Sequence, residues 1–127
     1  MNKCFFSGRF GREPDMSYTQ NGMAVLKFSL AVDLPAKDKD GKWSKRAIWP
    51  NFVAFGKTAE VLNQYCRKGD SITAIAAYSP REYQDKEGVT RMWHEFIVDS
   101  FEFGAKARGV TQEPAPDDLG ELEDIPF

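Results

Sequence analysis

A single helical pattern lies within a chain whose other segments alternate like β-strands, and this arrangement limits the possible folds. Residues 57–69 carry apolar side chains at helical spacing, with a candidate N-cap at Thr58 and a candidate C-terminal cap at Gly69. In contrast, residues 23–32 alternate between apolar and polar side chains, as a half-buried strand does. We therefore expect an all-β domain that contains one helix.

The order of the predicted elements is strand, strand, strand, helix, strand, strand. The five strands are predicted within residues 2–10, 23–32, 47–55, 70–84 and 89–103. Residues 11–22 are predicted to be rich in turns, 35–46 to form a polar loop or hairpin tip, and Pro50 favours an edge or bulge. Five strands with a helix between the third and the fourth are typical of the partly open oligonucleotide-binding (OB) barrel. A small antiparallel sandwich is the alternative.

Charge and composition change after Phe103. Residues 1–103 contain 15 Lys and Arg against 13 Asp and Glu, whereas residues 104–127 contain 2 against 6. The second segment is also rich in Pro and Gly and has no apolar period, which is typical of disorder. We therefore expect a folded domain in residues 1–103 and a disordered linker with an acidic tip in residues 104–127.

Catalysis and metal binding are not expected. Cys4 and Cys66 do not form a C-x-x-C pair, His94 is the sole histidine, and no phosphate loop or nucleophile motif is present. No cofactor is expected for the same reason. No segment resembles a signal peptide or a membrane span, so we expect a cytoplasmic protein that is not bound to a membrane.

Aromatic residues beside cations indicate a different class of function. Trp49 and Phe55 share one face of a predicted strand, and Lys57 follows them. Trp43 lies among lysines in the predicted loop, and Tyr83 lies close to Arg81 near a predicted turn. Exposed rings stack on bases and cations neutralise phosphates, so these residues favour binding of single-stranded nucleic acid. Aromatic residues in strands also fill cores, and their spacing alone leaves both interpretations open.

Three motif blocks also occur in a recognisable order. Residues 1–32 contain N-K, G-R-x-G-x-x-P, Y-T-x-x-G and A-V-x-x-F-S-L-A-V, residues 49–70 contain W-x-x-x-V-x-F-G-K-x-A-E, and the chain ends in D-I-P-F. Together these blocks resemble the bacterial-type single-stranded DNA-binding protein (SSB) family. The resemblance implies an OB barrel, a homotetramer, and sequence-independent binding of single-stranded DNA in the nucleoid.

The resemblance also implies particular site residues. Trp49, Phe55 and Tyr83 match positions that stack on bases. Positions that face the DNA backbone are matched by Lys3, Lys57, Lys68 and Arg81. The acidic tip implies binding of replication, recombination and repair proteins through Asp124, Ile125, Pro126 and Phe127.

The chain departs from the family pattern in two segments. Pro35 and Ala36 occupy the loop position where a stacking aromatic is common, and Trp43 is a candidate to replace that aromatic. Polar or basic residues are usual at the positions of Ser79 and Pro80, and a lysine is frequent at the position of Glu82. These departures keep open an alternative function, an OB-fold accessory or decoy that binds proteins through its tail and binds little DNA.

Overall fold

The computed structural model describes residues 1–106, which form nine strands and one helix. In chain order these are β1 Cys4–Phe10, β2 Asp15–Tyr18, β3 Ala24–Lys37, β4 Trp43–Ile48, β5 Asn51–Phe55, α1 Gly56–Tyr65, β6 Ser71–Tyr78, β7 Arg81–Gln84, β8 Thr90–Trp93 and β9 Phe96–Phe103.

Five of these strands close into a barrel. The sheet runs β1-β6-β9-β5-β3, and a short β1–β3 pairing joins its two ends. The β5–β9 pairing is parallel and the other pairings in the barrel are antiparallel. Since α1 connects the third barrel strand, β5, to the fourth, β6, the predicted OB-type barrel is confirmed and the sandwich alternative is wrong.

The inside of the barrel is filled mainly by aromatic and aliphatic side chains. Phe52 is 1% exposed and stacks on Phe28 with ring centroids 5.2 Å apart, while Phe6 meets it edge-on at 5.5 Å. Leu26 and Leu30 of β3 are fully buried beside them, as their two-residue spacing predicts. Complete burial of such a side chain contributes roughly 1.5–3 kcal/mol, so these residues anchor the barrel.

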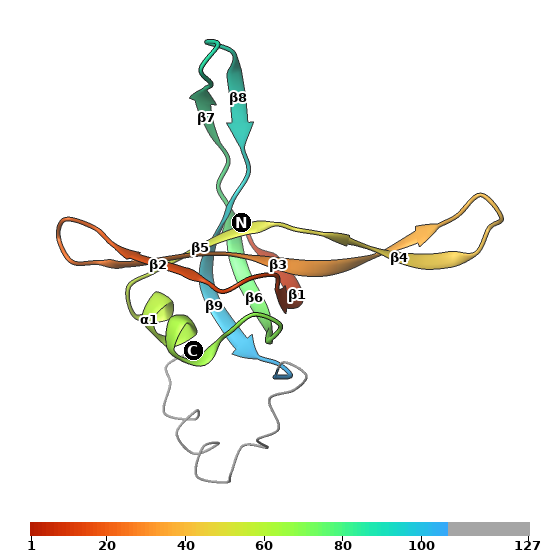
Figure 1. The fold of residues 1–127 in the computed structure, drawn as a ribbon, viewed down its shortest axis with the longest axis horizontal. Helices are drawn as coiled ribbons and strands as arrows, with labels where there is room; N and C mark the ends of the chain where they lie inside the picture. The colour runs from red at the N-terminus through yellow and green to blue at the C-terminus, as the bar shows by residue number, and fades with distance from the viewer. Residues whose placement is uncertain (107–127) are drawn as a thin grey trace, which may run out of the picture.

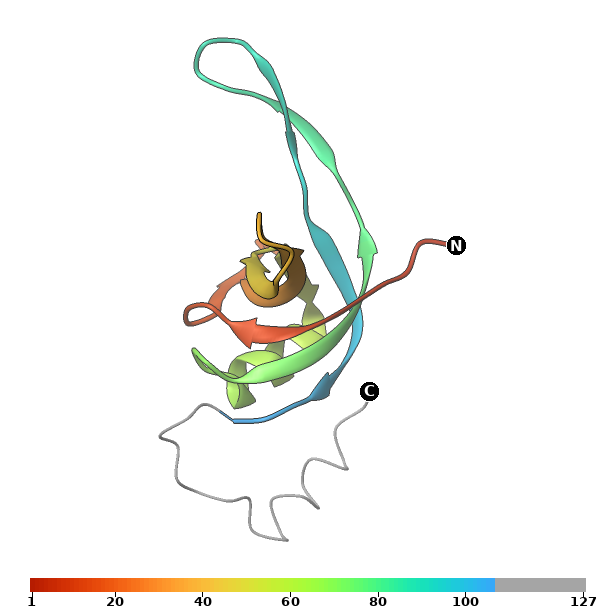
Figure 2. The ribbon, with the colours of Figure 1, turned by 90° about the vertical axis from the view of Figure 1, so that its right-hand side faces the viewer.

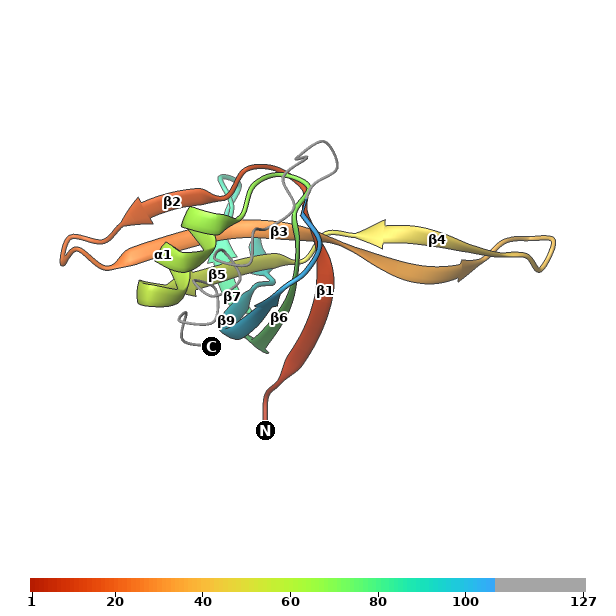
Figure 3. The same ribbon diagram turned by 90° about the horizontal axis from the view of Figure 1, so that it is seen from below.

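The helix covers the lower part of the barrel in Figure 1 and packs against β3 and β5 (Figure 3). Its buried residues are Ala59, Val61 and Leu62. The predicted caps are wrong: the helix begins at Gly56 after Phe55, whose side chain makes no capping hydrogen bond, and ends at Tyr65. Thr58 therefore lies inside the first turn, and the C-cap is Cys66 rather than Gly69.

Three hairpin arms extend beyond the barrel, formed by β2–β3, β3–β4 and β7–β8 (Figure 1). Figure 2 views the molecule from the side and shows the β7–β8 arm curving away from the barrel. Residues 11–22 therefore contain strand β2 where turns were expected, whereas residues 35–46 form the end of the β3–β4 hairpin, in agreement with the predicted hairpin tip. The cause is the long strand β3, which pairs with β2 through its buried first half and with β4 through its more exposed second half.

Candidate nucleic-acid interface

The outward-pointing side chains of β2, β3 and β5 form one continuous surface, named here the β2–β3–β5 face. Three cross-strand pairs define it on β3 and β5, namely Ser29 with Asn51, Lys27 with Val53 and Val25 with Phe55. Asp15 of β2 pairs with Lys27 on the other side. The intervening residues of β5, Phe52 and Ala54, point into the core as predicted, but Val53 on the other face is also buried, at 5% exposure, so this face is exposed to solvent only in part.

Trp49 lies at one end of this face and packs on Gly11. Its side chain is 55% exposed. A Cβ atom at position 11 would overlap the indole ring, approaching Cε3 to 3.0 Å. The N–H of Gly11 also donates to the carbonyl oxygen of Ser29, at 3.3 Å, which connects this loop to β3. Gly11 therefore positions Trp49, a role that the sequence prediction missed although the glycine lay in the G-R-x-G motif.

Pro50 lies between β4 and β5, where its missing N–H disturbs no strand pairing. Its carbonyl oxygen accepts a hydrogen bond from the N–H of Leu30, at 3.4 Å. This break between the strands matches the predicted irregularity at Pro50. Trp49 is thereby held on the surface between the β3–β4 arm and the barrel strand β5.

Phe55 lies at the other end of the face, as the last residue of β5, and is 42% exposed. Gly56 follows with φ of +61°, which turns the chain directly into α1. Exposed Lys57 follows this turn, two residues after Phe55. Between the two aromatic ends, Lys27 is also exposed. In the described part of the chain, neither lysine has a carboxylate within ion-pair distance.

The other predicted cations have different surroundings. Lys3 pairs with Asp99 through Nζ and Oδ2 at 2.7 Å, and Arg81 pairs with Glu95 at 3.6 Å. Lys68 is exposed, and its backbone N–H donates to Glu13 at 3.1 Å. The four predicted cations therefore differ in their capacity to neutralise phosphate, because two of them already face a carboxylate.

Two further predicted aromatic residues lie on separate arms rather than on the β2–β3–β5 face. Trp43 on the β3–β4 arm is 71% exposed, and the ammonium of Lys37 lies 5.8 Å from its ring centre, a cation–π contact. Tyr83 on the β7–β8 arm is 45% exposed. These arms point in different directions in Figure 1. Trp49 and Phe55 therefore lie at opposite ends of the β2–β3–β5 face, with Lys57 next to Gly56 after Phe55, whereas Trp43 and Tyr83 lie on separate arms.

Trp93 is an exposed aromatic residue that the sequence prediction missed. It ends β8, is 40% exposed, and faces Arg81 across the β7–β8 arm. Its neighbours in the sequence, Met92 and His94, gave no alternation from which its exposure could be predicted. Exposed Phe5 on β1 and Tyr18 on β2 were missed as well.

Two ionisable groups have clearly shifted pKa values. The hydrogen bond from Arg91, followed by those from the backbone, lowers the pKa of Asp85 at the tip of the β7–β8 arm. Burial raises the pKa of the Cys66 thiol to about 12, so this thiol is unreactive at neutral pH.

Other kinds of site receive no support from residues 1–106. Nowhere in this range do three His, Cys, Asp or Glu side chains come together as a metal site would require. No helix within the same range has the length and apolar character needed to cross a membrane. The predicted partner-binding residues Asp124, Ile125, Pro126 and Phe127 lie outside the described residues.

Comparison with known proteins relates the whole folded region to one family. The family model described as "Single-strand binding protein family" matches residues 1–104. A single-stranded DNA-binding protein of Fusobacterium nucleatum is 40% identical over 114 residues, which are 89% of this chain and 73% of that protein. Proteins of the same name from Neisseria meningitidis (34% identity over 98 residues) and Xanthomonas axonopodis (32% over 110) align with 77% and 86% of this chain. Those two alignments cover 56% and 61% of the relatives, so this chain spans less than two thirds of their length.

A solved structure has the same fold. The chain titled "Plasmodium falciparum SSB complex with ssDNA" superposes with a TM-score of 0.75 at 23% identity, covering 82% of this chain and 95% of that one. The family match over residues 1–104 and the OB-type barrel lead to the same conclusion: this chain belongs to the single-strand binding protein family.

Proposed function

We propose that the protein binds single-stranded DNA without sequence preference, using the β2–β3–β5 face as its main contact surface. The observation that carries this proposal is the pair of exposed rings, Trp49 and Phe55, at the two ends of one barrel face, with Lys27 and Lys57 beside them, neither of which has an ion-pair partner within residues 1–106. Each ring can stack on a base for roughly 1–3 kcal/mol. The lysines can neutralise phosphates and release counterions.

The chemistry of this face favours binding that does not depend on sequence. Every base has a π-face, and Phe55 has no hydrogen-bonding group that could select one base edge over another. Binding to duplex DNA is disfavoured on the same surface, because bases stacked inside a helix cannot also stack on Trp49. The relatives named above are called single-stranded DNA-binding proteins, which supports the same assignment.

A fluorescence titration of the full-length protein tests this function. Adding poly-dT at low salt should quench tryptophan emission, and a fluorescently labelled dT oligonucleotide should show a rise in anisotropy. Trp49→Ala should lower the affinity about 5- to 140-fold, which corresponds to one lost stacking contact. A duplex of the same length serves as the control. No rise in anisotropy with dT at low salt would contradict the proposal and would favour the accessory or decoy alternative.

A homotetramer is part of the proposal, and β1 offers a surface for self-association. β1 pairs with β6 from Cys4 to Arg9, but with β3 only at Arg9 and Phe10. Within residues 1–106 the second edge of Cys4–Gly8 has no ladder partner, and such an edge can pair with another copy. Phe5 on this strand is 68% exposed, beside the less exposed Ile75 of β6. Several barrels on one DNA strand would raise the affinity through multivalency.

Native mass spectrometry tests the assembly. A tetramer of this 14.4 kDa chain has a mass of about 58 kDa, four times the chain mass. Phe5→Asp should shift the population towards smaller species, because it puts a charge into the apolar contact, whereas Tyr18→Asp on a different arm should not. A wild-type protein that remains at 14.4 kDa at micromolar concentration would refute the tetramer.

The acidic tip is proposed to recruit replication, recombination and repair proteins in the cytoplasm, at the nucleoid. Asp124 supplies negative charge for a basic pocket, while Phe127 supplies an aromatic ring. Deleting residues 124–127 should abolish capture of such partners and leave dT binding unchanged or slightly tighter. A loss of dT affinity in this deletion would contradict the separation of the two roles.

A further inference from the structure

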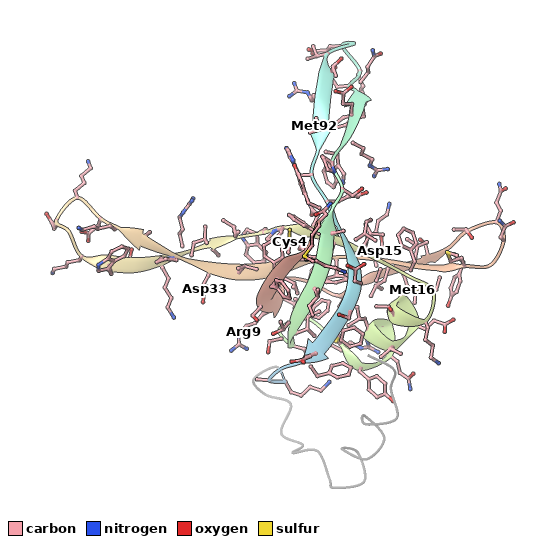
Figure 4. All side chains as sticks on the ribbon, turned by 180° about the vertical axis from the view of Figure 1, so that it is seen from behind. Cys4, Arg9, Asp15, Met16, Asp33 and Met92 are labelled. Carbon is pink, nitrogen blue, oxygen red and sulfur yellow. The ribbon has the colours of Figure 1, made fainter. Side chains whose placement is uncertain are left out.

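The β7–β8 arm carries aromatic and cationic residues on one side only. Its strands pair Arg81 with Trp93 and Tyr83 with Arg91, so these four side chains share one face, named here the arm face. The alternate pair, Glu82 with Met92, points to the opposite side, and Met92 is labelled on this arm in Figure 4. An open groove is lined by Arg81, Tyr83 and Trp93 of the arm face and also by Glu82, which belongs to the alternate pair.

Trp93 is held in place by a buried carboxylate. Its indole Nε1–H donates to Oε2 of Glu95 at 3.0 Å, and the same oxygen lies 3.6 Å from Nη2 of Arg81. Glu95 is only 9% exposed, whereas Trp93 is 40% exposed. The polar edge of the indole is therefore satisfied from within the protein while part of the ring remains open to solvent. A ring whose orientation is already fixed loses little conformational entropy when a base stacks on it.

Charge on this arm is balanced rather than positive. Arg81 faces Glu95, and Arg91 donates to Asp85 through Nε and Oδ2 at 2.7 Å. Residues 81–95 contain three Arg and Lys against four Asp and Glu. A surface of this kind attracts phosphates weakly, because each arginine already has a carboxylate partner. Binding here would depend on the rings, in contrast to the β2–β3–β5 face, whose lysines have no ion-pair partner among the described residues.

We propose that Trp93 is a stacking residue for a base of single-stranded DNA on the arm face, that Glu95 is its positioning residue, and that this contact adds affinity without adding salt dependence. The proposal deepens the proposed function and rests on it. Tyr83 was predicted from the sequence to stack, so the new elements are Trp93, its carboxylate anchor and the electrostatic neutrality of the site.

Single-tryptophan variants of the full-length protein test the contact directly, since the chain contains three tryptophans. The double substitution Trp43→Phe and Trp49→Phe leaves Trp93 as the sole reporter. Trp43→Phe with Trp93→Phe leaves Trp49. Binding is followed independently by the anisotropy of a labelled dT oligonucleotide. We expect the emission of Trp93 to be quenched as the oligonucleotide binds.

The outcomes separate this inference from the proposed function. Quenching of the Trp93 reporter supports the inference. Anisotropy that rises while Trp93 emission stays constant overturns the inference and leaves single-stranded DNA binding intact. Wild-type protein that gives no rise in anisotropy overturns the proposed function itself, and the inference with it.

Affinity and its salt dependence give the second test. Trp93→Ala should weaken dT binding about 5- to 140-fold and leave the slope of log affinity against log salt unchanged. Met92→Ala, on the opposite side of the same strand, should change the affinity less than twofold. An unchanged affinity in Trp93→Ala, or a slope altered as strongly as by loss of a phosphate contact, would overturn the proposal.

Substitution of Glu95 tests the positioning role. Glu95→Ala should reduce both the quenching of the Trp93 reporter and the affinity. Glu95→Gln should restore both, because its amide oxygen can accept the indole N–H. If Glu95→Ala leaves the quenching of Trp93 unchanged, or if Glu95→Gln restores neither quantity, the positioning role is wrong.

Discussion

Ion pairing in the free protein should determine which lysines contribute to the salt dependence of DNA affinity. Lys57 is exposed beside Phe55 with no carboxylate partner in the described part of the chain, whereas Lys3 contacts Asp99 at 2.7 Å. Both residues match positions that were expected to face the DNA backbone. If Lys57 neutralises one phosphate and Lys3 does not, Lys57→Ala and Lys3→Ala should differ in their salt dependence although each removes one positive charge.

The expected change in salt dependence can be calculated from counterion release. For single-stranded DNA the logarithm of affinity falls with the logarithm of salt concentration by about 0.7 per neutralised phosphate. Lys57→Ala should reduce this slope by about 0.7 for each contacting chain. Its affinity deficit relative to the wild type should then shrink about fivefold as salt rises tenfold. Lys3→Ala should leave the slope unchanged, because its ammonium is already matched by Asp99.

The assay is a dT titration followed by anisotropy at four or more salt concentrations over a tenfold range. Wild type and both variants are measured at one temperature and one oligonucleotide length. Lys27→Ala, on the β2–β3–β5 face, should behave like Lys57→Ala. Equal changes of slope in Lys3→Ala and Lys57→Ala would refute the reasoning, since ion pairing would then have no influence on which lysines meet phosphate.

Three other substitutions probe the site and the core. Gly11→Val should displace the Trp49 ring and lower dT affinity by up to the roughly 1–3 kcal/mol of one stacked base, measured by anisotropy; an unchanged affinity would show that Trp49 does not need Gly11. Phe52→Ala removes a ring that is 1% exposed and should lower the free energy of unfolding by about 3–5 kcal/mol in urea, and a loss under 1 kcal/mol would contradict this packing. Because its pKa is about 12, Cys66 should be thiolate in about one molecule in ten thousand at pH 8. In Cys4→Ser protein, iodoacetamide should therefore modify Cys66 only after unfolding, and rapid labelling of the native protein would count against its burial.

The barrel could be predicted from the sequence because burial imposes a period on its strands. Leu26, Phe28 and Leu30 point inward and are 0–4% exposed, which fixes their spacing. Strands β4, β7 and β8 have almost no buried residues, and β2 has only Met16 against the core, so no such period marks these four strands. Pro35 also disfavoured a strand, yet β3 passes through it and pairs it with Lys45. A proline is tolerated in a two-stranded arm, because its nitrogen can face the edge that has no ladder partner.

The candidate site was predicted only in part, for a related reason. Trp49 and Phe55 lie on the same predicted strand segment, so a two-residue period suggested a shared face, although the structure begins β5 only at Asn51. Gly11 and Lys27 join them through tertiary contacts that no local pattern contains. The pairing of Lys3 with Asp99 joins residues 96 positions apart, and a sequence shows such a cation only as a charge. The basic positions implied by the family resemblance therefore did not distinguish a lysine that is ion-paired in the free protein from one that is not.

Salt should consequently weaken DNA binding by the β2–β3–β5 face more than DNA binding by the arm face. On the β2–β3–β5 face, stacking acts together with Lys27 and Lys57, which have no ion pair in the described part of the chain, and salt weakens the phosphate part of that contact. On the arm face, Arg81 and Arg91 are already matched by carboxylates, so salt has little left to weaken. As salt rises, the ratio of wild-type to Lys57→Ala affinity should fall, whereas the ratio of wild-type to Trp93→Ala affinity should stay constant. The arm face would then contribute a growing fraction of the remaining affinity. This difference between the two faces depends on which cations have carboxylate partners rather than on the number of cations.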